Sequence, residues 1–150
     1  MKTKYITLAL FLTLNFAFSQ EAKYDENLAK SLNADERGMK NYVFCILKTG
    51  SNTTASDKEK AEFFKGHMDN IMRLGKEGKL VTAGPFGKND KNYRGIFIFN
   101  VATVEEAKAL VESDPAVKAN IFEAELTPWY ASAALMKVNE IHSTITKPKN

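Results

Sequence analysis

Residues 80–101 read "LVTAGPFGKNDKNYRGIFIFNV" and contain two short strands separated by one loop. The segments "LVTAG" (80–84) and "YRGIFIFNV" (93–101) are dense in β-branched and aromatic residues, whereas "PFGKNDKN" (85–92) is rich in turn-forming residues. Two strands joined by a loop of this length pair as antiparallel neighbours. This central pair decides how the flanking elements are arranged.

A long helix is predicted before this pair. Ser56 and Glu59 have the spacing of a capping box, which marks a helix start. Apolar residues then recur at helical spacing, namely Ala61, Phe64, Met68, Ile71 and Met72. Gly75 and Gly78 weaken the pattern, so we expect the helix to end near them. Its expected core face carries Phe64, Met68, Ile71 and Met72.

A second helix is predicted after the pair. Thr103 and Glu106 form another capping-box spacing, which opens "VEEAKALVES" (104–113). Pro115 follows Asp114 and breaks or restarts that helix, because proline lacks the N–H that a helix interior needs.

Strand-like segments close the pattern at both ends, as "NYVFCILK" (41–48) and "IFEAELTPW" (121–129). The order β-α-β-β-α-β is the split βαβ unit of a ferredoxin-like fold, so the predicted class is α+β with both helices on one face of the sheet. Residues 42–47 and 96–99 are apolar at every position, which indicates burial on both faces. We therefore expect a homodimer packed through the open sheet face.

The ends of the chain have other roles. Residues 1–19 combine Lys2 and Lys4 with an apolar run and small residues before Gln20, the pattern of a secretory signal peptide. This predicts export to the periplasm or outside the cell, without stable membrane insertion. Residues 20–40 are a polar extension with a short helix capped by Asp25, residues 41–138 the domain, and residues 139–150 a polar, disordered tail.

Composition argues against several classes. Two of the 21 Lys and Arg lie in the predicted signal peptide, which leaves 19 against 18 Asp and Glu, so the mature chain is close to neutral. The sequence lacks the basic stripe with interleaved aromatic residues that nucleic-acid binding would require. Cys45 stands alone in an apolar strand and is expected to be a buried small hydrophobe. Neither metal-ligand spacing nor a nicotinamide, flavin or phosphate-loop fingerprint occurs, so we expect neither metal nor cofactor.

His67 lies within the first helix among apolar residues, and two interpretations are open. It is either a buried neutral imidazole with one hydrogen-bond partner or the working group of a site. Asp114 likewise either caps the turn before "PAVKAN" or orients a histidine as general acid or base. Spacing alone does not show that the two residues meet.

Three segments together resemble the YCII-related (YciI-like) domain family: "GHMDNIMRLGKEGKLVTAGPFG" (66–87), "GIFIFNVATVEEAKALVESDPAV" (95–117) and "IFEAELTPW" (121–129). The resemblance runs from about Tyr42 to Tyr130. It implies a dimeric α/β barrel with a histidine–aspartate pair, here His67 and Asp114, as the candidate catalytic residues. Some relatives are implicated in eliminating chloride from a chlorinated aromatic diol, and the histidine has been suggested as a phosphate acceptor.

We therefore predict a small-molecule acid/base enzyme that eliminates or isomerises a small cyclic substrate. Its pocket would be shaped by Gly84, Pro85 and Phe86, while Phe97 or Phe99 packs in the core and Trp129 and Tyr130 lie at the dimer seam or over the pocket. One alternative is a non-catalytic dimeric small-ligand-binding domain of the cell envelope. Another is a cofactor-free monooxygenase acting on quinol-like substrates.

Overall fold

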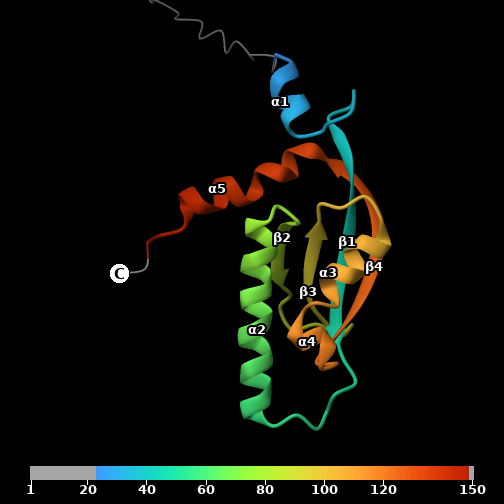
Figure 1. The fold of residues 1–150 in the computed structure, drawn as a ribbon, viewed down its shortest axis with the longest axis vertical. Coiled ribbons are helices and arrows are strands. Elements are labelled where there is room, and N and C mark those ends of the chain that lie inside the picture. Colours follow the sequence, from blue (N-terminus) through green and yellow to red (C-terminus); the bar gives the residue numbers. More distant parts are fainter. Residues whose placement is uncertain (1–22, 149–150) are drawn as a thin grey trace, which may run out of the picture.

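The computed structural model describes residues 23–148. The predicted signal peptide, residues 1–19, lies outside them. A short helix, α1 (Glu26–Ser31), has Asp25 as its N-cap, as predicted, and precedes the long strand β1 (Met39–Thr49). The helix α2 (Asp57–Lys76) follows and runs along one side of the sheet (Figure 1). Both halves of the predicted Ser56–Glu59 capping box are formed.

The central pair forms as predicted. Strands β2 (Leu80–Pro85) and β3 (Tyr93–Phe99) are antiparallel neighbours, and α3 (Val104–Val111) and the short α4 (Pro115–Lys118) follow. The last strand, β4 (Phe122–Ser132), pairs antiparallel with β1 along its whole length. The sheet order is β2-β3-β1-β4. This mixed α/β arrangement, with a four-stranded antiparallel sheet, is compatible with the predicted ferredoxin-like fold.

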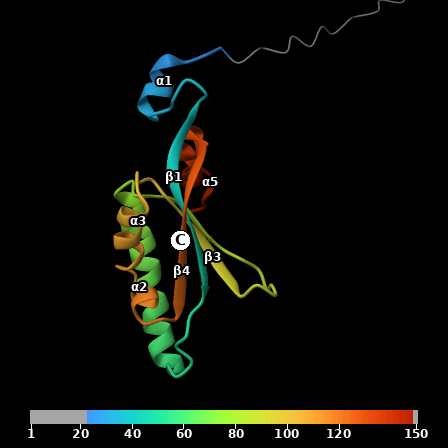
Figure 2. The same cartoon turned by 90° about the vertical axis from the view of Figure 1, so that its right-hand side faces the viewer.

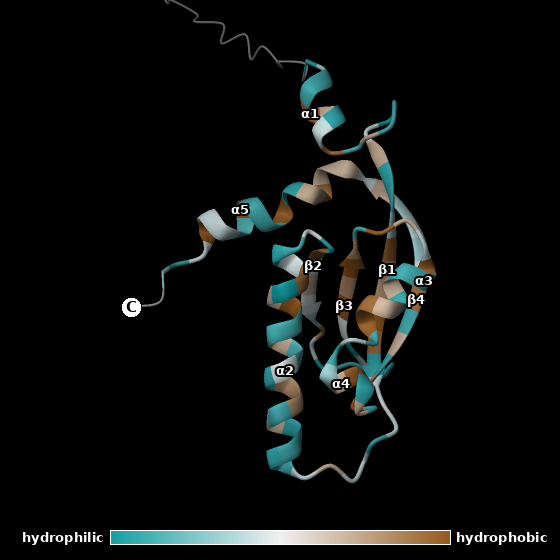
Figure 3. Ribbon diagram, in the orientation of Figure 1, coloured by the Kyte–Doolittle hydropathy of each residue, from teal (hydrophilic) through white to brown (hydrophobic). Residues whose placement is uncertain are grey.

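The main core lies between the sheet and the helices α2 and α3. Its largest members are Phe97, Phe99 and Leu74, and Cys45 is fully buried among them, as predicted. Figure 2 shows α2 and α3 together on one side of the sheet. Figure 3 shows the corresponding split in α2, which is polar on the side away from the sheet.

The core face of α2 differs from the prediction in part: Ile71 packs against the core as predicted, but the other three residues do not. Phe64, Met68 and Met72 are more than two-fifths exposed, whereas Asn70 and Leu74 are buried. The buried surface of α2 is a narrow stripe along positions 70 and 74, and the three apolar residues beside this stripe remain exposed. A polar side chain in the stripe needs partners inside the protein, and the candidate site supplies them.

The second face of the sheet is partly covered by the chain's own C-terminal segment. Tyr42, Val81, Ile98 and Ala131 form a smaller core there, packed against Leu135 and Met136 of the 3-10 helix η1 (Ala133–Lys137). Trp129, at the edge of this face, contacts the rings of Tyr42 and Phe44 and remains 38% exposed. The chain itself therefore covers part of the face that we expect a second copy to cover, and the homodimer stays a prediction.

The predicted disordered tail is also corrected. Residues Val138–Ile145 form the helix α5, which extends past the edge of β2 (Figure 1). The side chain of Asn139 donates a hydrogen bond of 2.9 Å to the carbonyl of Leu80. Val138, Ile141 and Ile145 recur at helical spacing, a signal that the polar residues between them obscure. No helix among residues 23–148 is long and apolar enough to cross a membrane.

Candidate functional site

The structure brings His67 and Asp114 together. His67 lies midway along α2, and Asp114 is the N-cap of α4, where its Oδ1 accepts a hydrogen bond of 2.9 Å from the Ala116 backbone N–H. The other carboxylate oxygen, Oδ2, is 2.8 Å from His67 Nδ1. The two roles considered for Asp114, a local cap and a partner of His67, are therefore filled by different oxygens of one side chain.

Asp114 is fully buried, yet its carboxylate is well supplied with donors. Burial by itself opposes ionisation, but the hydrogen bond and charge of His67, the amide of Asn70 and the Ala116 N–H outweigh it and hold the pKa of Asp114 below its ordinary value. An ionised Asp114 accepts a hydrogen bond from the Nδ1–H of His67, which leaves Nε2 of the neutral ring as its basic nitrogen.

Sequence reasoning missed a polar network behind this pair. Asn70 Nδ2 donates to Asp114 Oδ2 over 3.2 Å, and Asn70 Oδ1 accepts from Arg73 Nη2 over 2.7 Å. Arg73 also reaches Ser113 Oγ at 3.2 Å and Glu77 at 2.9 Å. The signal was the spacing: positions 67, 70 and 73 are one helical turn apart and lie on one side of α2.

The charges at both ends fix the orientation of the Asn70 amide. A guanidinium can only donate and a carboxylate can only accept, so the amide oxygen faces Arg73 and the amide nitrogen faces Asp114. Asn70 thus connects an exposed cation to a buried anion and is itself 7% exposed.

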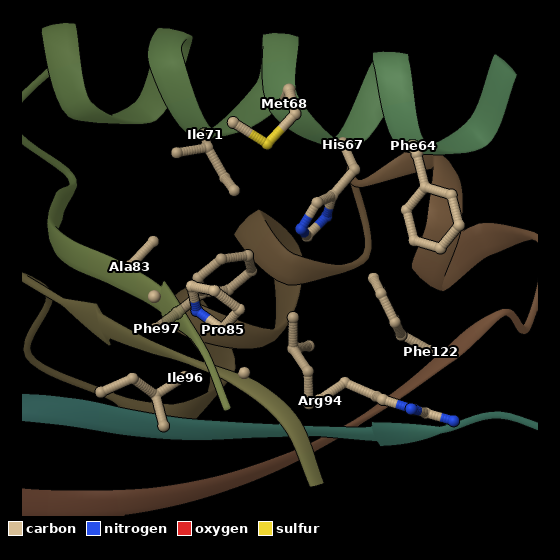
Figure 4. A pocket seen from close by; sticks show the side chains of 13 residues that line it. Phe64, His67, Met68, Ile71, Ala83, Pro85, Arg94, Ile96, Phe97 and Phe122 are labelled. Carbon is tan, nitrogen blue, oxygen red and sulfur yellow. The ribbon is translucent and has the colours of Figure 1, made fainter. Parts of the chain in front are cut away.

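The imidazole projects from α2 into a cavity of about 310 Å³ between α2 and the sheet (Figure 4). It stacks on Phe97 at a centroid distance of 5.7 Å and meets Phe122 edge-on at 5.2 Å. Within residues 23–148 the structure gives Nε2 no hydrogen bond. Of the described residues that line the cavity, His67 and Arg94 have polar side chains; the others are Leu47, Phe64, Met68, Ile71, Ala83, Gly84, Pro85, Gly95, Ile96, Phe97 and Phe122.

The predicted pocket residues are brought together in part. Gly84 and Pro85 line the cavity, but Phe86 does not; it lies against Tyr93 at 5.9 Å and is 45% exposed. Phe86 follows the last residue of β2, and its backbone N–H still donates to the Arg94 carbonyl of β3 over 2.9 Å. Phe97 was predicted to be a core residue and is one, yet it is also part of the cavity wall. Neither Trp129 nor Tyr130 lines the cavity.

Residues 23–148 contain neither a set of metal ligands nor a nucleophilic thiol. Among residues 23–148 no group of three His, Cys, Asp or Glu side chains could hold a metal ion. Burial raises the pKa of the Cys45 thiol to about 12, so this sulfur is not nucleophilic near neutral pH.

The chain belongs to the YCII-related domain family, whose model matches residues 42–130, and the resemblance seen in the sequence is confirmed. The 5-chloro-2-hydroxyhydroquinone dehydrochlorinase (TftG) from Burkholderia phenoliruptrix AC1100, solved with 2,5-dihydroxybenzoquinone, is similar in structure. Its sequence is 23% identical, the match covers 58% of this chain and 92% of that one, and the TM-score is 0.42. No curated protein matches the chain.

Proposed function

We propose that this protein is a small-molecule enzyme in which His67 acts as general acid or base and Asp114 orients it. The observation that supports this most is the 2.8 Å contact between His67 Nδ1 and the buried Asp114 carboxylate, made by a ring in the wall of a cavity. A base must be within hydrogen-bond reach of the proton it abstracts, and Nε2 would meet a molecule bound in this cavity.

The reaction that fits is proton abstraction followed by elimination or isomerisation of a small cyclic substrate. The cavity volume, about 310 Å³, is at the lower end of the range of ligand sites, roughly 300–1,000 Å³. The rings of Phe97 and Phe122 flank the imidazole and suit a flat substrate body. Abstraction at Nε2 gives an imidazolium, whose charge the Asp114 carboxylate would stabilise. The same proton is then available to a leaving group or to another carbon.

The test has two parts. First, ¹⁵N NMR of the histidine rings should show the neutral His67 ring protonated on Nδ1, a preference that Asp114→Asn removes. Second, small cyclic hydroxy and keto compounds in D₂O should undergo exchange or loss of a C–H proton with wild type but not with a folded His67→Gln variant. A ring protonated on Nε2 in wild type, or equal conversion by the two proteins, would refute the proposal.

A non-catalytic binding domain is the second candidate. The observation that favours it is the lining of the cavity, which is apolar apart from His67 and Arg94. It predicts that cyclic compounds bind with the same affinity to wild type and to Asp114→Asn, and that neither protein converts them.

The proposal includes a homodimer formed through the open sheet face and export by the predicted signal peptide. The dimer is supported by the partly exposed Trp129 beside Phe44 on that face. Export is supported by the pattern of residues 1–19 alone.

A further inference from the structure

The side chain of Arg94 reaches the cavity because β3 contains an extra residue. In the β1–β3 ladder Leu47 pairs with Gly95, but the next residue, Lys48, pairs with Tyr93. Arg94 is therefore left without a partner on β1, in a β-bulge, while on the other side of β3 its carbonyl accepts from the Phe86 N–H over 2.9 Å. A bulge turns a side chain away from the face that regular alternation would give it, and bulges are frequent beside active sites.

One end of the guanidinium is anchored and the other is not. Arg94 Nε donates to Thr49 Oγ1 over 2.7 Å, which fixes the group at the end of the cavity near Phe122 (Figure 4). Within residues 23–148 no acidic side chain forms an ion pair with Arg94, and its two terminal nitrogens make no hydrogen bond. These nitrogens form the fork that binds carboxylate oxygens in pairs.

The rest of the cavity wall is apolar apart from His67, so the guanidinium of Arg94 indicates which class of ligand the cavity would bind. The other side chains that line the cavity, apart from His67, are aliphatic, aromatic or thioether groups, and Gly84 and Gly95 have none. A neutral apolar ligand would need no guanidinium at the rim. A ligand with an apolar body and one anionic group would place the body between Phe97 and Phe122 and the charge at Arg94.

We propose that the cavity binds a small organic anion, a flat apolar body with one carboxylate or phenolate oxygen group, which Arg94 anchors while the body faces His67. This inference rests on the proposed function, since it identifies the substrate class of the same site. It makes Arg94 a specificity-determining residue: the anchored anion would hold the body in one orientation, with the same atom at Nε2 each time.

Benzoate and benzamide are suitable probes, because they share shape and ring and differ in charge. Binding to the purified protein would be followed by NMR, through the backbone amides of Gly84 and Gly95 and the His67 ring. Wild type should bind benzoate about tenfold more tightly than benzamide. Arg94→Met, which keeps the aliphatic stem, should bind both equally, with benzamide affinity unchanged. Arg37→Met, at an exposed arginine distant from the cavity, should retain the wild-type preference.

The outcomes separate this inference from the proposed function. If benzamide and benzoate bind the wild-type cavity equally, or Arg94→Met keeps the preference, the role of Arg94 is refuted while the cavity stands as a ligand site. If neither probe shifts the cavity signals, the cavity is not a site for small cyclic ligands, and the proposed function and this inference both fail. Heat denaturation of each variant shows that it is folded.

Discussion

Gly66 of α2 and Pro115 of α4 touch, and their contact sets the distance between the two halves of the candidate site. A Cβ at position 66 would stand 2.7 Å from Pro115 Cγ, closer than real Cβ atoms come, and 3.1 Å from Pro115 Cβ, which is tighter than most such contacts. His67 follows Gly66 and Asp114 precedes Pro115 in the chain. The bare backbone at Gly66 therefore lets the two helices approach until Nδ1 and the carboxylate are 2.8 Å apart.

The same substitution at two glycines of α2 should have opposite effects. Gly66→Ala should lower the free energy of unfolding by about 1–3 kcal/mol, because the added methyl group overpacks the contact with Pro115. Gly75→Ala, where an added Cβ meets nothing within 4 Å, should raise it by roughly 0.5–1 kcal/mol, because alanine favours the helix. Urea denaturation measures both values. Equal effects would show that the α2–α4 contact is not tight.

Asp114 should contribute a pH-dependent part of the stability. Its pKa in the folded protein lies below the ordinary value of 3.8, so the unfolded chain takes up the proton first as the pH falls. The stabilisation is present above the ordinary value and is lost as the pH falls through the folded value. The difference in unfolding free energy between wild type and Asp114→Asn should therefore shrink below about pH 4. Urea titrations from pH 2.5 to 6 measure it; a difference that grows in acid would contradict the assignment.

The local parts of the site could be predicted from the sequence, because short-range chemistry fixes them. The capping box of Ser56 and Glu59 starts α2 where the pattern indicates, and Asp114 caps the turn at Pro115. What spacing could not give is the meeting of His67 with Asp114. That depends on the approach of α2 to α4, which the small size of Gly66 permits.

The error in the core face of α2 arises because hydropathy treats each side chain alone. Asn70 looks like a surface residue, but the carboxylate of Asp114 and the guanidinium of Arg73 satisfy its amide and allow its burial. Met68 and Met72 look like core residues but flank the buried stripe of α2.

The role of Arg94 in the cavity could not be predicted from the sequence, because a bulge is a property of strand pairing, which the residues of β3 alone do not reveal.

Asn70 should matter to the His67 ring and to stability alike. Asn70→Leu removes the donor to Asp114 Oδ2, so the carboxylate loses one of the contacts that hold it on Nδ1. The ¹⁵N spectrum should then show a smaller Nδ1–H population in the neutral ring, with a stability loss of about 1–3 kcal/mol from the broken buried hydrogen bonds. Asn139→Leu is the matched control, because it breaks the bond to Leu80 without touching the network. If both variants leave the ring spectrum unchanged, Asn70 is structural only.

Cys45 should be inert in the folded protein. Its side chain is fully buried and burial raises the pKa of the thiol to about 12, so the thiolate that reacts with alkylating reagents is scarce. Iodoacetamide at pH 8 should leave the native protein unmodified and add one group per chain in concentrated urea, as read by mass spectrometry. Rapid modification without urea would show that β1 opens far more readily than its place in the core implies.

The open sheet face should be tested at Trp129, because its ring lies on Phe44 at 5.7 Å and stays partly exposed. If two copies pack through this face, Trp129→Arg would place a charge in an apolar interface and should shift the sedimentation coefficient from dimer to monomer at micromolar concentration. Tyr24→Arg, at an aromatic that is 73% exposed and precedes α1, should remain dimeric. A monomeric wild type would refute the dimer. It would also show that the cover given to this face by Leu135 and Met136 is sufficient for a stable fold.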